Sequence, residues 1–200
     1  MSHASRSLLW RAYSVAILVF GAWVASEHRP ELQLERSAVG HGEWWRLWTG
    51  HLVHGSVEHF RYDVAVAALM GLAFGRLWWL LMAAPALSLA LLFGLPGLEY
   101  YFGLSGLLHA WMVLEAGKLA REQRGWPAAL AGTLALGTLL KAGLETALEQ
   151  SFFSADMQMG GAVVHASHFI GSLFGLFLLL AGPLTSRWLS SVYSSCARPR

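Results

Sequence analysis

Long apolar stretches separated by short polar segments dominate this chain of 200 residues. A helix needs about 20 residues to cross a hydrocarbon core of about 30 Å. Six stretches meet or approach that length, at residues 8–26, 47–74, 77–95, 100–120, 126–148 and 160–182. The Pro96-Gly97 pair and the Gly125-Trp126-Pro127 group are typical breaks between helices. The pattern predicts an all-α integral membrane protein, with residues 1–200 forming one bundle of six transmembrane helices.

Composition supports a membrane protein and argues against several other classes. Hydrophobic residues make up 56% of the chain and charged residues 13%, against about 25% charged residues in soluble domains. The net charge of +2 is too small to indicate nucleic-acid binding. The single cysteine excludes an internal disulfide. We expect no cofactor and no metal.

The distribution of basic residues predicts the orientation of the bundle. With the N-terminus in the cytoplasm, nine basic residues fall in the inner segments, namely Arg6, Arg11, Arg76, Lys118, Arg121, Arg124, Arg187, Arg198 and Arg200. The outer segments hold Arg29, Arg36 and Arg46. An excess of Lys and Arg on the cytoplasmic side is the usual rule, so we expect both termini in the cytoplasm.

The predicted second span carries an unusual number of polar residues. Glu58, Arg61 and Asp63 would each cost roughly 2.5–3.5 kcal/mol at the centre of a lipid-exposed helix. At helical spacing, one face of this span would present His51, His54 or Gly55, His59 and Asp63. We expect this face to point into the bundle, with His51 in a structural or interfacial position. Ionisable groups inside a membrane are functional by default, so His59 and Asp63 are candidate site residues.

A serine between glycines in the fourth span is the candidate nucleophile. Gly103 and Gly106 flank Ser105 in the sequence "GLSG", and His168 in the sixth span precedes Gly171 and Gly175. Gly-x-x-x-Gly lets two membrane helices approach closely. The second, fourth and sixth spans run in the same direction. At about 1.5 Å per residue, His59, Ser105 and His168 lie at comparable depths below the outer face.

These residues predict acyl-transfer chemistry. A serine hydroxyl needs a base to take its proton, and a neutral imidazole at hydrogen-bond distance does this. The oxyanion of the intermediate needs preorganised donors. We assign Ser105 as nucleophile and His168 as base, with the Ser105 amide and His59 as oxyanion donors. His54, Asp63 and Gly103 support them. No third acid is evident near His168 in the sequence, so the arrangement predicts a dyad.

Taken together, the motifs resemble those of rhomboid intramembrane serine proteases. The stretch "GEWWRLWTGHLVHGSVEHFRYD" resembles the first-loop Trp-Arg motif and the histidine-bearing second helix. "GLSG" resembles the catalytic-serine motif, and "HFIGSLFG" resembles the His-x-x-Gly-x-x-x-Gly motif of the sixth helix. The resemblance covers residues 42–182.

Within this family, the chain most resembles the rhombosortase branch. The shared features are the short six-span form, the stretch "LPGLEYYFGLSGLLHA" and Asp63 four residues after His59. This resemblance implies a protease of the bacterial inner membrane whose active site opens to the periplasm. It also implies the substrates, which are secreted proteins with a C-terminal GlyGly-CTERM membrane tail. The partners expected are therefore such a tail and the lipid bilayer, and no nucleic acid.

Two departures from the family pattern leave alternatives open. Many rhomboids have Asn where this chain has Asp63, so Asp63 either orients His59 or stays protonated. Many rhomboids have Tyr where this chain has His109, which makes His109 a rival to His168 as the base. Two other functions are also open. One is a non-catalytic rhomboid-like protein that binds membrane segments, and the other is a small transporter that relays protons along its His and Asp residues.

Overall fold

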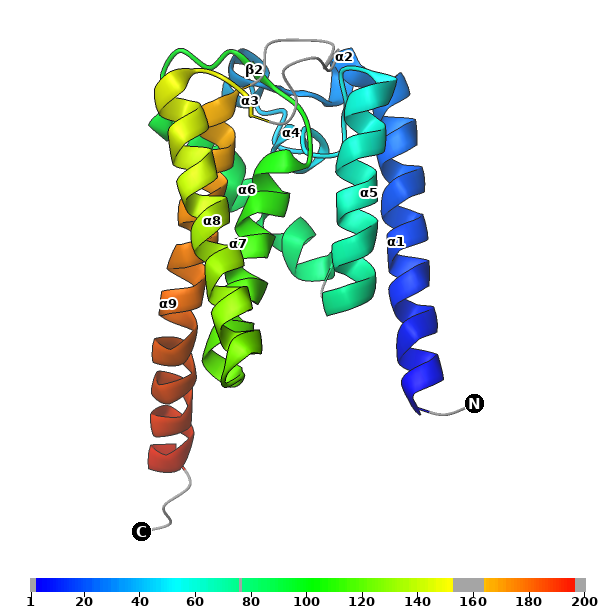
Figure 1. Ribbon diagram of the computed structural model, residues 1–200. Helices are drawn as coiled ribbons and strands as arrows, with labels where there is room; N and C mark the ends of the chain where they lie inside the picture. The colour runs from blue at the N-terminus through cyan, green and yellow to red at the C-terminus, as the bar shows by residue number, and fades with distance from the viewer. Residues whose placement is uncertain (1–2, 76, 153–163, 197–200) are drawn as a thin grey trace.

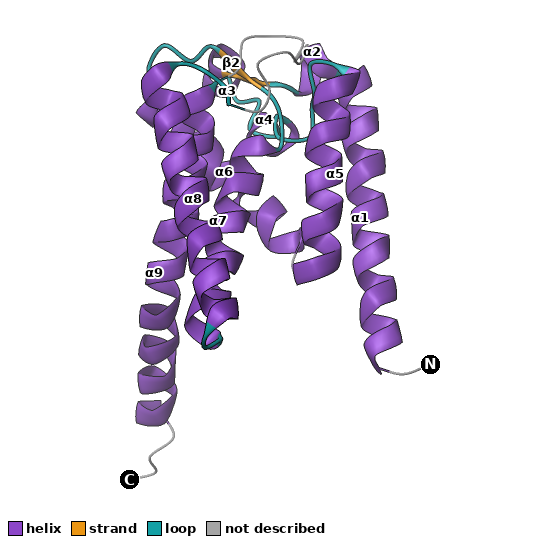
Figure 2. Cartoon of the chain, viewed as in Figure 1, coloured by secondary structure: helices purple, strands orange, loops and turns teal. Residues whose placement is uncertain are grey.

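The computed structural model describes residues 3–75, 77–152 and 164–196, which are mostly helical (Figure 1, Figure 2). The long helices are α1 (His3–Glu27), α5 (Val57–Phe74), α6 (Leu77–Gly94), α7 (Ser105–Glu122), α8 (Trp126–Leu148) and α9 (His165–Cys196). Figure 1 shows them aligned side by side, with α7, α8 and α9 gathered on one side and α1 beside α5 on the other. The start of α1 and the end of α9 lie at the same end of the molecule.

Short elements form a cap at the opposite end (Figure 1). They are α2 (Arg29–Leu32), β1 (Leu34–Glu35), α3 (Arg36–Gly40), α4 (Arg46–Thr49) and β2 (Tyr100–Tyr101). The two strands pair antiparallel, with Leu34 opposite Tyr101. This pairing ties the segment after α1 to the segment that leads into α7.

Within the described residues, three helices are long and apolar enough to cross a membrane. They are the Ser5–Glu27 part of α1, all of α8, and the His165–Gly182 part of α9, with mean hydropathies of 1.6, 1.3 and 1.5. α6 contains a shorter apolar segment, Trp79–Gly94. α5 and α7 contain more charged residues, among them Asp63 and Glu115. These three helices support the prediction of a helical membrane protein, but they do not by themselves show a bundle of six spans.

The predicted second and fourth spans begin too early in the sequence. Residues 47–56 form the end of α4 and an irregular segment, and α5 begins only at Val57. Ser56 ends the irregular segment because its hydroxyl accepts a hydrogen bond from the His59 amide at 3.1 Å, a typical helix N-cap. In the fourth span, residues 100–104 form β2 and a turn, and Gly103 has φ of 118°, which favours glycine.

The sixth predicted span differs at both ends. α9 begins at His165 and continues to Cys196, well beyond residue 182. Residues 160–163 lie outside the described part of the chain. The predicted first, third and fifth spans coincide with α1, α6 and α8 to within a few residues, because their apolar runs end at clear polar or glycine-proline breaks.

Glycines bring α7 and α9 into backbone contact. A Cβ added at Gly171 would overlap the carbonyl oxygen of Gly106, and one added at Gly175 would overlap that of Ala110. These contacts fit the packing role predicted for Gly106, Gly171 and Gly175. The close approach matters for the site because Ser105 precedes Gly106 and His168 lies one turn before Gly171.

Arginines hold the cap together. The buried Arg46 guanidinium donates hydrogen bonds to Glu43 Oε2 at 2.7 Å and to the carbonyls of Pro30 and Gln33 at 2.9 Å. Arg36 donates to the carbonyl of Leu92 in the last turn of α6 and to the carbonyls of Leu95 and Leu98 just beyond it. The cap thereby fixes the loops from which α5 and α7 start.

Candidate active site

Three helices begin at the capped end of the bundle and bring the candidate residues together (Figure 1). Ser105 is the first residue of α7, and His59 and His168 lie in the first turns of α5 and α9. All three are therefore nearer the helix ends than the sequence predicted, because α5 and α7 begin later than expected. The amide ends of helices carry partial positive charge, which favours an anion at this position.

Ser105 and His168 are hydrogen-bonded to each other across α7 and α9. The distance from Ser105 Oγ to His168 Nε2 is 3.0 Å, and both residues are half-buried. Ser172 donates a hydrogen bond to the His168 carbonyl at 2.8 Å. A serine paired with an imidazole in this way has the geometry that a nucleophile and its base require.

His109 lies against His168 and does not take its place. The two imidazole rings are stacked, with centroids 4.3 Å apart and planes 9° apart. His109 Nδ1 is 2.8 Å from the Ser105 carbonyl oxygen, so this nitrogen donates to the backbone one turn earlier. The geometry therefore favours His168 over His109 as the base for Ser105, and His109 supports the flat face of the His168 ring.

Gly103 gives His59 access to the start of α7. A Cβ at Gly103 would lie 2.8 Å from His59 Cε1 and Nε2. The ring of His59 therefore rests on the backbone two residues before Ser105. Combined with the positive φ at Gly103, this contact explains why glycine is required there.

Asp63 connects His54 and His59 to the start of α7. Its Oδ2 accepts a hydrogen bond from the Leu104 amide at 2.9 Å and lies 3.3 Å from both His54 Nε2 and His59 Nε2. All three side chains are buried. Of the two roles left open for Asp63, the geometry favours orientation of His59, and it adds a cap for α7 that the sequence did not reveal. The Leu104 amide is thereby occupied.

The same three side chains are the described residues that could hold a metal ion. One ligand atom from each of His54, His59 and Asp63 lies within 4.8 Å of the others. Two histidines and a carboxylate would suit Zn²⁺. The Asp63 oxygen in question already accepts the Leu104 amide and lies at ion-pair distance from both imidazoles, so the cluster is explained without a metal ion.

The predicted four-residue helical stripe is wrong in its first half. His51 and His54 lie in the irregular segment before α5, so helical spacing does not relate them to His59. His54 still joins the cluster, because Ser26 of α1 accepts a hydrogen bond from the His54 amide at 3.0 Å. His51 is separate, with Nε2 2.9 Å from Ser88 Oγ and 3.2 Å from the Ala84 carbonyl. It has the structural position that we expected for it.

A carboxylate that sequence reasoning missed lies beside His168. Glu145 of α8 is 2% exposed, and its Oε2 is 3.6 Å from His168 Nδ1 and 2.7 Å from Lys141 Nζ. The sequence does mark this position, because Lys141 and Glu145 are two charged residues four apart in an otherwise apolar span. Intramembrane ionisable residues merit a functional hypothesis, and this pair was overlooked because no motif includes it.

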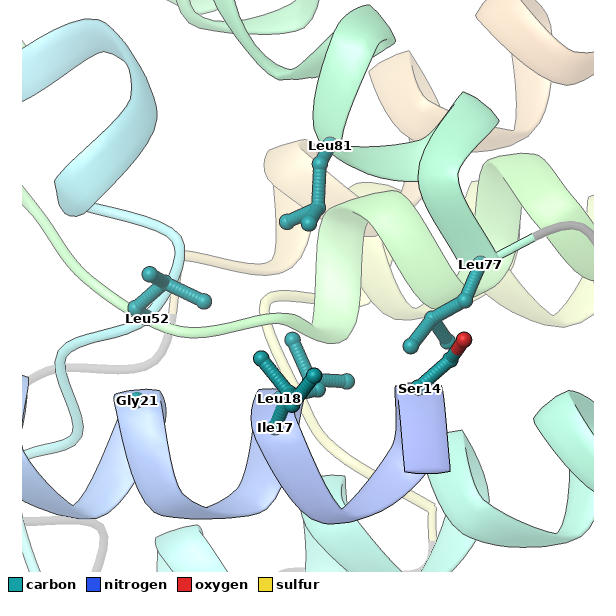
Figure 3. A pocket seen from close by; sticks show the side chains of 7 residues that line it. All are labelled: Ser14, Ile17, Leu18, Gly21, Leu52, Leu77 and Leu81. Atoms are coloured by element: carbon teal, nitrogen blue, oxygen red, sulfur yellow. The ribbon is translucent and has the colours of Figure 1, made fainter. Parts of the chain in front are cut away.

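An apolar cavity of about 150 Å³ lies away from these residues, between α1, α6 and the segment before α5 (Figure 3). It is lined by Ser14, Ile17, Leu18, Gly21, Leu52, Leu77 and Leu81. Its wall offers no base and no charged group. The cavity is therefore separate from the candidate residues Ser105 and His168.

Comparison with known proteins adds no assignment, because no family model matches the chain and no curated protein matches it. The functional argument therefore depends on the residues and their geometry.

Proposed function

We propose that this protein is an intramembrane serine protease of the rhomboid type, with Ser105 as nucleophile and His168 as general base. The observation that carries the proposal is the 3.0 Å contact between Ser105 Oγ and His168 Nε2 at adjoining helix ends. A transporter relay would not need a serine at this position. The wider resemblance of the motifs to rhomboids points to the same chemistry.

In the proposed reaction, His168 Nε2 takes the proton from Ser105 as Oγ bonds to the substrate carbonyl carbon. The carbonyl oxygen becomes an oxyanion, which the Ser105 amide, His59 and the amide end of α7 stabilise. His168 then gives its proton to the leaving nitrogen as the peptide bond breaks. Water, deprotonated by His168, releases the acyl group from Ser105.

We further propose that α1 and α5 to α9 are the six spans of a rhomboid-like bundle. Two charged residues of α5 that would be costly in lipid lie away from the centre of the bilayer or inside the protein. Asp63 is buried against histidines, and Arg61 is exposed in the first turns of the helix. The start of α1 and the end of α9 share one end of the molecule (Figure 1), as an even number of spans requires. The excess of basic residues makes that end cytoplasmic, and the capped site then opens to the periplasm of a bacterial inner membrane.

The substrate class follows from the resemblance to rhombosortases. It is a secreted protein with a C-terminal GlyGly-CTERM tail, which the enzyme would cut near the glycines. Glycine disfavours helix and would let the scissile bond extend at the end of the tail helix. The site's place in the first turns of α5, α7 and α9 is consistent with a cut near the membrane surface.

The test uses the full-length enzyme in membranes with a GlyGly-tailed reporter. Wild type and the control Ser14→Ala should release the reporter and react with a fluorophosphonate probe, whereas Ser105→Ala should do neither. Ser14 is a suitable control because its hydroxyl donates a hydrogen bond within α1, to the Trp10 carbonyl. Mass spectrometry of the new C-terminus would locate the cut. Unchanged release by Ser105→Ala would refute the proposal, and a wild type inert to the probe would favour a non-catalytic binding protein.

A further inference from the structure

Glu145 is a buried acid at a position where an apolar side chain would be less costly. α8 is long and apolar enough to cross a membrane, yet near its end Glu145 is almost fully enclosed. Removing a carboxylate from water costs several kcal/mol, and pairing with a cation does not reliably recover that cost. The ion pair with Lys141 therefore explains how Glu145 is tolerated and does not explain why an acid is there.

Each oxygen of Glu145 has a distinct environment. Oε1 accepts a hydrogen bond from the Phe152 amide at 2.9 Å, which folds the chain after α8 back over the helix end. Oε2 is 2.7 Å from Lys141 Nζ and 3.6 Å from His168 Nδ1. The carboxylate is thus held in one orientation, with its second oxygen directed at the imidazole.

His168 needs a partner at that nitrogen. Nε2 can accept the Ser105 proton only if the neutral ring carries its hydrogen on Nδ1. His168 Nδ1 is buried, and within the described residues it has no hydrogen-bond partner at shorter range. The separation of 3.6 Å is longer than a hydrogen bond, but catalytic hydrogen bonds are often long in free enzymes and shorten once substrate is bound.

We propose that Glu145 is a positioning residue for His168. Its carboxylate holds the hydrogen on Nδ1 and stabilises the imidazolium that forms when Ser105 is deprotonated, so the site works as Ser-His-Glu and not as a dyad. Lys141 and the Phe152 amide hold the carboxylate in place. This inference rests on the proposed protease function and adds a third group to it.

The test compares Glu145→Gln with a matched substitution elsewhere. Gln keeps the size of Glu145 and can still accept from the Phe152 amide, but it presents an uncharged group to His168. The control is Glu115→Gln, because Glu115 is also a buried acid paired with a lysine, Lys118, at 2.9 Å. It lies ten residues along α7 from Ser105, about 15 Å away.

We expect Glu145→Gln to lower kcat for the GlyGly-tailed reporter about 10- to 100-fold, part of the 10²–10⁴ that acid–base catalysis supplies. KM should stay close to wild type, because Glu145 acts through His168. Any fall in the thermal unfolding midpoint should be similar in Glu115→Gln, because both substitutions remove the acid from an acid–lysine pair. Glu145→Asp, which restores the charge with a shorter reach, should recover part of the lost kcat. Glu115→Gln should retain wild-type kcat.

The outcomes separate this inference from the proposed function. If Glu145→Gln and Glu145→Asp both keep wild-type kcat while Ser105→Ala is inactive, the protease stands and the role of Glu145 is refuted. Equal losses in Glu145→Gln and Glu115→Gln would also refute it, since both would then reflect the loss of any buried ion pair. If Glu145→Gln does not accumulate in membranes, Glu145→Asp decides, and a kcat equal to wild type refutes the role. Cleavage that survives Ser105→Ala overturns the proposed function itself.

Discussion

Replacing Gly171 with alanine tests the helix contact on which the site depends. In the structure, a Cβ at this position would lie 2.9 Å from the carbonyl carbon of Gly106 and 3.2 Å from its Cα, with the carbonyl oxygen closer still. Ordinary contact begins at 3.4 Å. These neighbours are backbone atoms of α7, which cannot rotate away as a side chain would. The two helices must therefore separate.

The size of that separation can be estimated from the same contacts. The carbonyl carbon needs about 0.5 Å more room, and the oxygen needs about 1 Å. Ser105 is adjacent to Gly106 along the chain, so a shift of about 1 Å would lengthen its 3.0 Å contact with His168 to about 4 Å, beyond hydrogen-bond range. A displacement of 1 Å at a catalytic group costs about 10²-fold in rate. Overpacking should also destabilise the fold by about 1–3 kcal/mol.

The assay is the rate of fluorophosphonate labelling and of reporter cleavage, together with thermal unfolding in detergent. Gly137→Ala is the matched control, because Gly137 is an exposed glycine inside α8 with nothing within 4 Å of an added Cβ. Both substitutions gain similar helix propensity, so their difference isolates the clash. If Gly171→Ala labels within about twofold of wild type and unfolds at the same temperature, the reasoning on close packing fails.

Two further predictions concern the cap. Arg46→Ala leaves the carbonyls of Pro30 and Gln33 without their buried donor, so we expect the unfolding free energy to fall by about 2 kcal/mol or more. The control is Arg61→Ala, at an exposed arginine, which should cost less than about 0.5 kcal/mol. Equal losses in chemical denaturation would contradict this. Burial lowers the pKa of His51 from 6.5 to about 4, so the unfolded chain binds a proton that the folded protein excludes. The contribution of neutral His51 to the unfolding free energy should be fully present above pH 6.5 and should fall by up to about 3 kcal/mol as the pH drops to 4. A fall of the same size in His51→Asn would show that another group is responsible.

Local pattern was enough to predict the long helices, except for the starts of some of them, and to single out the candidate residues within them. Apolar runs bounded by glycine and proline placed α6 and α8 to within a residue, since helix length in a membrane is governed by the run itself. Ser105 between two glycines and His168 before a glycine repeat were recognisable because nucleophile, base and close packing each need particular residue types. The candidate residues follow from these local features, and their catalytic roles remain predictions.

The starts of α5 and α7 depended on contacts that lie far apart in the chain. Arg46 and the β1–β2 pairing hold residues 47–56 outside α5 and residues 100–104 outside α7, although the composition of both segments suits the start of a span. For that reason the expected helical stripe from His51 to Asp63 was only half right. His54 reaches Asp63 because the loop is folded and anchored to Ser26, which no periodicity reveals.

The sequence by itself determined which segments are helical and apolar, which serine and histidine are candidates, and where glycines let helices touch. Only the tertiary structure decided which side chains meet. Glu145 is 23 residues before His168 on a different helix, and the two are adjacent because α8 and α9 both pack on α7. A carboxylate's partner depends on the relative rotation and depth of helices, and these are set by packing across the whole bundle and not by spacing along the chain.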